Sequence, residues 1–493
     1  MSDRLGFLYS SAAIREHIYV PRYYAPEIGD RLRALEATHD LVALGTLLDA
    51  GHLLVTSGHE IGKMAYGTGP VPFVRTSDIS NWEIKADVKQ GVSEEWYTRY
   101  AARQDVRPGD VLFVRDGTYL VGSCCLVTEA DGRLLYQSHI LKFRVLPPSA
   151  LSAPLLLALL SSPIVRRQIA AKRFTADIID TVGNRYRELV LPVPRDPAKR
   201  SRVEQRVSSL IAERVHLRER LRRVPFWAEG LIPDLSVAPP SADAYLDGAG
   251  NHGFLMPRSQ LRPGIYVPRY YSPHVTARLA ELASTHDLVP LGELVERRAV
   301  SLSVGAEVGK MAYDTGPIPF IRTSDIASLE LKTDPKQSVS EEVFHRYRAA
   351  ASADPGDILL VRDGTYLVGS SCIVTPYDGP MLFCGGLYRI RVIRRHEVDP
   401  YLLLAVLNTP IVRQQVRAKQ FARDIIDTLG KRVLELVLPI PKDPELRAEL
   451  ARVTRQAVER RAALRNEARD IALEVERGAP GIGEEDLEAI RLL

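Results

Sequence analysis

The sequence predicts a mixed α/β (α+β) fold made of two tandem copies of one module, and two observations carry this prediction. The heptapeptide IYVPRYY at 18–24 returns at 265–271, and the offset of 247 residues still holds between LVLPVPRDP (189–197) and LVLPIPKDP (436–444). Within each copy, short strand-like runs alternate with amphipathic stretches. Because this period far exceeds the roughly 20–50 residues of a solenoid repeat, we expect duplicated domains and a pseudo-twofold molecule.

Local signals predict the elements of the first copy. The runs 71–79, 110–117 and 140–146 combine β-type residues with bounding Gly, Pro or Asp, which indicates strands. Residues 154–174 have apolar spacing near 3.6 and a basic end, which indicates a helical segment, and 188–194 is the predicted closing strand. The second copy should repeat these elements 247 residues later.

A long charged helix should follow each module. Asp196–Pro197 and Asp443–Pro444 place an N-cap residue before a proline suited to the first helical turn. Apolar residues then recur every seven positions, as in a coiled-coil seam that Arg214 and Arg461 interrupt. The seam residues are Val203, Leu210, Leu217 and Val224 in the first copy, and Leu450, Ala457, Leu464 and Ile471 in the second. A long polar helix is hard to stabilise alone, so the favoured partner is the other copy's helix, with a solvated surface helix as the alternative.

Composition places the chain among ordinary globular proteins. With 45% hydrophobic and 26% charged residues in 493 positions, each half can build its own core. The richest apolar run, 153–162, is shorter than the roughly 18 residues of a membrane span, and the N-terminus has no secretion signal pattern. We therefore expect a cytoplasmic protein with no membrane partner. The four cysteines, Cys124, Cys125, Cys372 and Cys384, show no CxxC spacing, so they are expected in the core and neither a metal nor another cofactor is predicted.

Two segments are nearly unchanged between the copies. Residues 62–79 and 309–326 agree at 15 of 18 positions, and residues 109–125 and 356–372 agree at 14 of 17. Each contains an apolar strand that ends in Arg, Thr, Ser, Asp or Gly. Arg suits bidentate contacts with guanine or phosphate, Ser and Thr suit phosphates, and Gly allows close backbone approach. In the alternative interpretation, the side chains of Arg75, Asp78, Arg115 and Asp116 pair with one another and hold a turn.

The search for catalytic motifs is mostly negative. The sequence has no Walker loop, GxSxG elbow or HExxH, and it lacks the cofactor loop and Asn-Pro-Pro-aromatic turn of an adenine methyltransferase. One pattern, Asp78 with Glu83 and Lys85, returns as Asp325, Glu330 and Lys332, and such groups on adjacent strands can bind Mg²⁺ in nucleases. The short spacing leaves little room for a turn between two strands, so we expect a solvated strand end. If the chain does not bind DNA as a non-catalytic protein, the alternative functions are a Mg²⁺-dependent nuclease and a protein-binding scaffold.

The order of these segments resembles the specificity subunit of type I restriction-modification systems. PFVRTSDI is followed by PGDVLFVRDGTYLVG, QSHILKFRV, the helical 154–174, ELVLPVP and a long helix, and the whole order occurs twice. The resemblance implies two target recognition domains, two long helices packed as an antiparallel coiled coil, and a split DNA target of which each domain reads one half. It also implies double-stranded DNA and two adenine methyltransferase subunits as partners, with a translocating restriction subunit joining for restriction.

The expected domains and DNA-contacting residues follow from this resemblance. The domains are target recognition domain 1 at 1–197, spacer helix 1 at 198–224, a linker at 225–252, target recognition domain 2 at 253–444, spacer helix 2 at 445–477 and a tail at 478–493. The candidate contacts are Lys63, Tyr66, Arg75, Thr76, Ser77, Arg115, Thr118, Tyr119, Gln137, His139, Lys172, Arg173, Lys310, Tyr313, Arg322, Thr323, Ser324, Arg362, Thr365, Tyr366, Lys419 and Arg423.

Differences between the copies indicate which of these residues read bases. GHLLVTSGHE (51–60) corresponds to RAVSLSVGAE (298–307), and YQSH (136–139) corresponds to FCGG (383–386). Gln137 and His139 are expected to contact base edges, Gln favouring adenine, with drift in a surface loop as the alternative. The basic helix ends near Lys172 and Lys419 are expected to contact phosphates without reading sequence, with a solvated helix face as the alternative.

Overall fold

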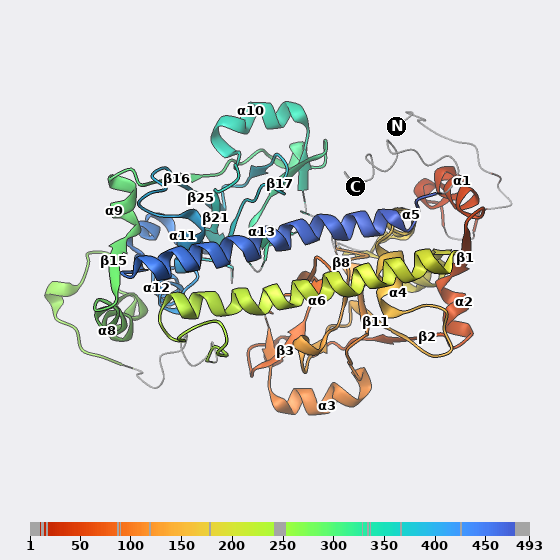
Figure 1. The fold of residues 1–493 in the computed structure, drawn as a ribbon, viewed down its shortest axis with the longest axis horizontal. Coiled ribbons are helices and arrows are strands. Elements are labelled where there is room, and N and C mark those ends of the chain that lie inside the picture. Colours follow the sequence, from red (N-terminus) through yellow and green to blue (C-terminus); the bar gives the residue numbers. More distant parts are fainter. Residues whose placement is uncertain are drawn as a thin grey trace. The chain divides into compact units, whose positions relative to one another are not determined.

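The structure is a computed structural model that describes residues 10, 14–15, 18–85, 88, 90–117, 120–176, 179–240, 253–327, 329–332, 335, 337–364, 367–423 and 426–478. The chain divides into two compact units, one of Met1–Ala212 with Glu467–Leu493 and the other of Glu213–Asn466. This division falls within both long helices, α6 (Pro197–Ala228) and α13 (Pro444–Glu474), which can be followed in Figure 1. The domain boundaries expected from the sequence remain a prediction.

A four-stranded antiparallel sheet forms the centre of the first unit. Its strands run in the order β2 (Leu53–Ser57), β11 (Ile140–Val145), β7 (Val111–Val114) and β9 (Cys124–Leu126). Every residue of β7 is buried, because this strand has a neighbour on each side and helix α4 (Ala153–Ser161) packs against it. The strands predicted near 110–117 and 140–146 are confirmed.

Smaller sheets and helices complete the first unit. The sheets are β10 (Leu135–Tyr136) with β3 (Val71–Val74) and β6 (Gly91–Val92); β12 (Phe174–Ala176) with β13 (Ile179–Thr181) and β8 (Asp116–Gly117); β1 (His39–Ala43) with β14 (Val190–Pro194); and β4 (Ile79–Ser80) with β5 (Glu83–Ile84). The remaining helices are α1 (Pro26–Leu35), α2 (Leu44–Asp49), α3 (Glu94–Gln104) and α5 (Pro163–Lys172). The predicted closing strand is β14.

The second unit contains the same sheets in the same strand orders. Its central sheet is β16 (Val300–Val304), β25 (Leu387–Val392), β21 (Ile358–Val361) and β23 (Ser371–Ile373). The smaller sheets are β20 (Gln337–Val339) with β17 (Ile318–Ile321) and β24 (Leu382–Phe383); β22 (Asp363–Gly364) with β27 (Ile426–Thr428) and β26 (Phe421–Arg423); β15 (His286–Pro290) with β28 (Val437–Pro441); and β18 (Ile326–Ala327) with β19 (Glu330–Leu331). The helices are α8 (Pro273–Leu282), α9 (Leu291–Glu296), α10 (Glu341–Ala351), α11 (Pro400–Leu407) and α12 (Pro410–Lys419).

Three predicted elements differ from the structure. The helical segment 154–174 is two helices, because Pro163 has no N–H to continue α4 and instead begins α5. The strand 71–79 ends at Val74, since the side chain of Asp78 accepts a hydrogen bond from the Arg75 backbone N–H (2.9 Å) and turns the chain. Helix α6 continues past the predicted end at 224, through Pro225, to Ala228. The carbonyl of Ala228 accepts a hydrogen bond from His286 Nε2.

The predicted seam residues of α6 and α13 are all buried, with exposed fractions of 0–8%. In the second unit the two helices run antiparallel, since Arg214 lies beside Arg461 and the charge of Arg220, further along α6, acts on Glu449, further back along α13. Both nitrogens Nε and Nη2 of Arg460 also bind Glu213, each at 2.7 Å. Helix pairing in this unit therefore combines an apolar seam with buried and half-buried ion pairs.

Arg214 and Arg461 do not interrupt the helix pair in the second unit. Each donates from Nη1 to the other's backbone carbonyl, at 2.9 and 2.8 Å, and each donates from Nη2 to Oε1 of Glu330, at 2.6 and 2.7 Å. Burial alone raises the pKa of Glu330, but the charges of Arg214, Arg461 and Arg465 outweigh it and lower the pKa to about 2. We call Arg214, Arg461 and Glu330 the arginine knot.

The C-terminal end of a long helix is anchored in each unit by the same pair of interactions. In the second unit, Glu229 accepts hydrogen bonds from the Ile411 N–H (2.7 Å) and from Arg278 Nε (3.2 Å), and His286 Nε2 donates to the Ala228 carbonyl (2.9 Å). In the first unit, Glu476 accepts from the Ile164 N–H (2.7 Å) and Arg31 Nη2 (3.0 Å), and His39 Nε2 donates to the Val475 carbonyl (2.7 Å). The glutamates thereby satisfy the free N–H groups at the starts of α12 and α5.

The described part of the chain also bears on the expectations about cysteines and membranes. All four cysteines are free and buried, as expected for small core residues. Among the helices of the described ranges, none is long and apolar enough to cross a membrane.

Candidate nucleic-acid interface

The first unchanged segment forms a strand followed by a tight turn. After β3, the carboxylate of Asp78, which is 2% exposed, binds the Arg75 N–H and so fixes Arg75, Thr76 and Ser77 on a half-exposed turn. The guanidinium of Arg75 lies 5.7 Å from the ring centre of Tyr66, and that ring packs against Phe73. The turn thus presents one cation and two hydroxyls on a rigid base.

The second unit repeats this turn. Asp325 accepts from the Arg322 N–H at 2.8 Å, which places Arg322, Thr323 and Ser324 as their counterparts are placed in the first unit. Arg322 lies 6.0 Å from the ring centre of Tyr313. In both units the aspartate thus holds the turn through a hydrogen bond from the backbone N–H of the arginine.

The second unchanged segment gathers polar groups around Asp116. Arg115 donates to Asp116 Oδ2 from Nε and Nη2, at 2.9 and 2.8 Å, and His139 Nδ1 lies 3.1 Å from the same oxygen. Burial raises the pKa of Asp116, but hydrogen bonds from His139, Arg115 and Thr181 lower it to about 2. Asp116 therefore stays ionised and orients both Arg115 and His139.

The second unit lacks half of this arrangement. Arg362 pairs with Asp363 at 2.9 Å and lies 5.9 Å from the ring centre of Tyr388, but Gly386 stands where the first unit has His139. The carboxylate of Asp363 is also more exposed than that of Asp116, at 26% against 9%. The two units thus differ beside an otherwise matching Arg–Asp pair.

Two of the segments in which the copies differ, 51–60 with its counterpart and 136–139 with its counterpart, lie side by side in each unit. In the first, His59 forms a β-bridge with Gln137, and Ser138 Oγ donates to Glu60 Oε2 at 3.1 Å. In the second, Ala306 bridges Cys384, and a Cβ atom at Gly385 would lie 2.7 Å from Glu307 Oε1. We call 57–60 with 137–139, and 304–307 with 384–386, the variable patch.

Glycine is required where the two parts of the patch meet. A Cβ atom on Gly58 would lie 2.2 Å from the Gln137 carbonyl oxygen, and one on Gly305 would lie 2.3 Å from that of Phe383. Within the patch, Gln137 is only 7% exposed, whereas Ser138 and His139 are half-buried. The polar side chains of the first patch that are exposed or half-buried are therefore Ser57, His59, Glu60, Ser138 and His139.

The cations at the helix ends are engaged by protein groups. Lys172 binds Glu188 at 3.0 Å and lies 4.4 Å from the ring centre of Tyr23, and Lys419 makes the equivalent contacts with Glu435 and Tyr270 at 3.1 and 4.5 Å. Each lysine side chain is 15% exposed. Arg173 lies 3.7 Å from Asp180. These residues thus have structural contacts, and their expected binding of phosphates stays a prediction.

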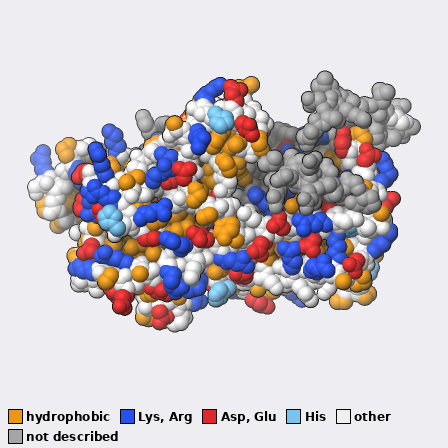
Figure 2. Space-filling view, turned by 45° about the horizontal axis from the view of Figure 1, so that its top comes forward, with side chains coloured by type: hydrophobic (Ala, Val, Ile, Leu, Met, Phe, Trp, Pro, Cys, Tyr) orange, Lys and Arg blue, Asp and Glu red, His pale blue; other side chains and the backbone are white. Residues whose placement is uncertain are grey.

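Some candidate residues lie apart from these clusters. Lys63 and Lys310 are exposed on short turns before β3 and β17. Thr118, Tyr119, Thr365, Tyr366 and the side chain of Arg423 lie outside the described residues. On the face shown in Figure 2, Lys and Arg side chains are interspersed with Asp and Glu.

The Asp–Glu–Lys pattern requires a correction. The spacing was expected to leave little room for a turn between two strands, yet β4 and β5 pair through a two-residue turn, with Asn81 and Trp82 at φ of 54° and 64°. The glutamates were expected at a solvated strand end, yet Glu83 and Glu330 are 5% and 4% exposed. Glu330 belongs to the arginine knot, and the described residues hold no cluster of three His, Cys, Asp or Glu suited to a metal.

Two exposed residues were missed by the sequence reasoning. Met64 and Met311 are each 93% exposed, directly after Lys63 and Lys310, on turns whose sequence is unchanged between the copies. An unchanged apolar residue between Gly-Lys and Ala-Tyr was the available signal. A methionine presented in this way can contact a thymine methyl group or a base step, so both residues join the candidate interface.

No protein-family model and no curated protein matches the chain, whereas several solved structures do. Among solved structures, the chain is similar to the S subunit of a type I restriction-modification system from M. genitalium, at 12% identity and a TM-score of 0.34, over 90% of this chain and 96% of that one.

Two further matches carry related descriptions. One is a chain from a study of complex assembly and conformational transition of the type I R-M system, at 18% identity and a TM-score of 0.27, over 90% of this chain and 98% of that one. The other is the HsdS subunit from Thermoanaerobacter tengcongensis, at 18% identity and a TM-score of 0.25, over 92% of this chain and 96% of that one. Two of these three descriptions thus name a type I restriction-modification system, and the third names an HsdS subunit.

Proposed function

We propose that this chain is the DNA-specificity subunit of a type I restriction-modification complex, and that each unit reads one half of a bipartite target. The variable patch carries the proposal. In each unit, two of the segments in which the copies differ meet at one place, beside an Arg–Asp pair common to both. Reading two different half-sites with one scaffold requires such an arrangement, in which common groups position the DNA and a local surface varies.

The proposed division of labour follows from the side chains. The Arg-Thr-Ser turns and the exposed Lys63 and Lys310 position the backbone of the DNA, while Ser138 and His139 contact base edges in one half-site. Gln137 contributes through the shape of the loop, because its side chain is buried. Two methyltransferase subunits flip and methylate the adenine that this chain selects, and a restriction subunit adds cleavage.

Mapping N6-methyladenine tests this function. Genomes of cells with and without this gene are sequenced, with the methyltransferase gene intact in both. We expect a split motif whose two half-sites are nearly inverted repeats, present only with the gene. An unchanged methylome contradicts the proposal. In that case, a complex with other proteins that retains no DNA favours a scaffold. Mg²⁺-dependent cleavage of DNA by the purified chain favours a nuclease.

A graft between the copies tests the variable patch. Replacing Phe383-Cys384-Gly385-Gly386 by Tyr-Gln-Ser-His should make the target more symmetric. The fold should accept the graft if Thr323 yields slightly, because the group nearest a Cβ at position 385 is the end of the Glu307 side chain, whereas a Cβ at position 386 would lie 3.0 Å from Thr323 Cγ2. Asp363 is present to orient the new histidine. One bidentate contact changes base discrimination by about 1–3 kcal/mol.

The readout of the graft is the methylated motif of the assembled complex. Gly385→Ala alone is the matched control for folding, since it adds the Cβ but no hydrogen-bonding group. An unchanged motif in an assembled, active complex would show that these loops do not read bases.

A further inference from the structure

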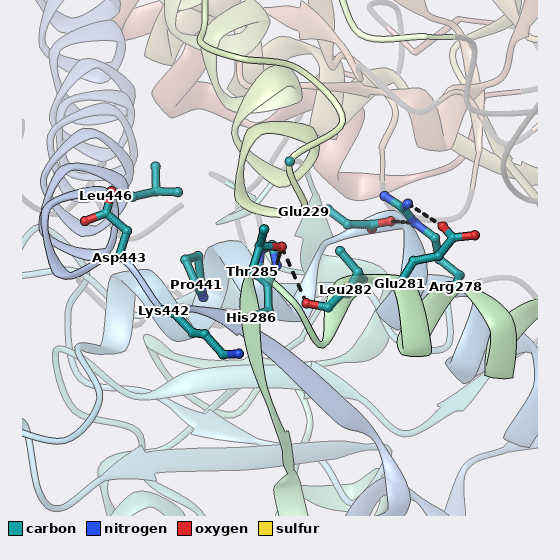
Figure 3. Close-up of a pocket in the computed structure, with 11 residues that line it drawn as sticks. Glu229, Arg278, Glu281, Leu282, Thr285, His286, Pro441, Lys442, Asp443 and Leu446 are labelled. Carbon is teal, nitrogen blue, oxygen red and sulfur yellow. Dashed lines mark hydrogen bonds and ion pairs between the residues drawn. The ribbon is translucent and has the colours of Figure 1, made fainter.

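A cavity of about 530 Å³ lies in the second unit where the end of α6 meets α8 and the start of α13. Figure 3 shows Leu446 and Asp443 on one side of it, and Glu229 with Arg278 on the other. The cations at its edge are already engaged: Arg278 binds Glu281 at 2.9 Å, and Lys442 donates to the Ala283 carbonyl at 2.7 Å. Glu229 is 2% exposed and Asp443 is exposed, so the cavity offers carboxylates at two depths.

The first unit shows what fills the equivalent place. Lys199 stands 247 residues before Leu446, and its Nζ donates to the carbonyls of Val475 (3.0 Å) and Arg477 (2.7 Å). The negative charges of Glu474, Asp196 and Glu476 act on it, Glu474 most strongly, and offset part of the cost of its burial. A primary ammonium group is therefore bound at the end of α13 by two backbone carbonyls beside three carboxylates.

Part of this ammonium site persists in the second unit without its lysine, and Trp227 stands where the first unit has Glu474. Ala228, Glu229 and Asp443 correspond to Val475, Glu476 and Asp196, and the Ala228 carbonyl takes a histidine hydrogen bond as the Val475 carbonyl does. The backbones diverge after this point, since Gly230 has a φ of 73° whereas the left-handed glycine of the first unit is Gly478. The shared part of the site is one carbonyl and two carboxylates.

We propose that the cavity binds the primary ammonium group of a small aliphatic amine, such as a diamine, in place of the missing lysine. The carboxylates of Glu229 and Asp443, which line the cavity, receive the ammonium, and the alkyl chain lies along Leu446. A cavity of this size accommodates a small ligand, within the usual range of about 300–1,000 Å³. Binding fastens α6 to the second module, whether or not the chain binds DNA.

Thermal unfolding and calorimetry of the full chain with putrescine test this site. We expect putrescine to raise the melting temperature saturably, by roughly 2–4 °C, while tetramethylammonium chloride at equal ionic strength does not, because it has no N–H donor. Leu446→Lys should raise the melting temperature without amine and abolish the putrescine response. Leu446→Met, which keeps an apolar chain of similar size, should respond as the wild type does.

Three outcomes overturn the proposal. The first is a wild-type chain that shows neither a saturable shift nor heat of binding with putrescine. The second is a Leu446→Lys variant that responds like the wild type, which places the amine elsewhere. The third concerns the reverse change in the first unit: Lys199→Leu should lower the melting temperature, and failure of putrescine to restore it contradicts the equivalence of the two sites.

Discussion

Glu330→Gln is expected to destabilise the second unit by about 3–5 kcal/mol, the cost of removing one partner from a buried ion pair. The substitution keeps the volume of the side chain but removes the negative charge between Arg214 and Arg461, which are 0% and 2% exposed. Neither guanidinium can reach solvent to recover its hydration. Urea unfolding of the full chain measures the loss, followed by tryptophan fluorescence with Trp227 reporting from the second unit.

Two further variants show whether the charges are the cause. Glu296→Gln, at an exposed position of the same unit, should change stability by no more than about 0.5 kcal/mol. Replacing the knot as a whole, with Arg214→Met, Arg461→Met and Glu330→Leu, should restore most of the stability, because no unpaired charge remains buried. A Glu330→Gln loss below about 1 kcal/mol would mean that the arginines are satisfied without it.

The pH dependence of this effect has a fixed sign. The pKa of Glu330 falls from 4.5 to about 2 on folding, so its contribution is present above about pH 4.5 and is lost as the pH falls toward 2. The stability difference between wild type and Glu330→Gln should therefore shrink over that range. A difference that is constant from pH 5 to pH 2.5 contradicts the assignment.

Lengthening the helix pair by one turn is expected to change the DNA target without changing its half-sites. Four residues add about 6 Å to a helix, or about two base pairs at roughly 3.4 Å each. Two antiparallel helices keep their pairing when lengthened only if the inserted residues lie opposite each other. The register at Arg214 and Arg461 places Val207 opposite Ala468, so four residues are inserted after each. The methylated motif should keep both half-sites and gain one or two unspecified base pairs between them.

A one-sided insertion is the matched control. Four residues after Val207 alone lengthen one helix against an unchanged partner, so the end of α13 no longer reaches Ile164 and His39 in register. We expect that variant to lose methylation of every sequence. With the paired insertion, methylation of the original target should fall by roughly 100-fold, since one half-site no longer fits. Unaltered spacing in an active complex contradicts a role for the helices in setting it.

The seam and the strands were predictable because they depend on periodicity, and the arginine knot was not. Val203 and Leu450 recur on a seven-residue pattern that a reader of the sequence can count. Arg214 breaks this pattern, and its partner Glu330 lies 116 residues away in a hairpin, so no local rule connects them. The equivalent hairpin of the first unit, β4–β5, was misjudged because Asn81 and Trp82 adopt left-handed backbone conformations, which are rare for a tryptophan.

The sequence indicated which residues belong to the candidate site, but not which of their side chains are exposed. Comparing the copies identified Gln137 and His139, and the structure brings their loop against the other differing segment. Whether a polar residue of a loop faces solvent depends on tertiary packing, however, and Gln137 is buried. Met64 was overlooked because an apolar residue is normally expected in the core, whereas the structure exposes it.

The anchoring of Glu476 and Val475 has a consequence for the order in which the chain folds during synthesis. The second unit is one continuous stretch, Glu213–Asn466, whereas the first needs Glu467–Leu493 to be complete. His39 and Ile164 leave the ribosome 436 and 312 residues before their hydrogen-bond partners. The unit that is translated first is therefore completed only after the second unit has emerged, and until then its exposed surface needs protection by chaperones.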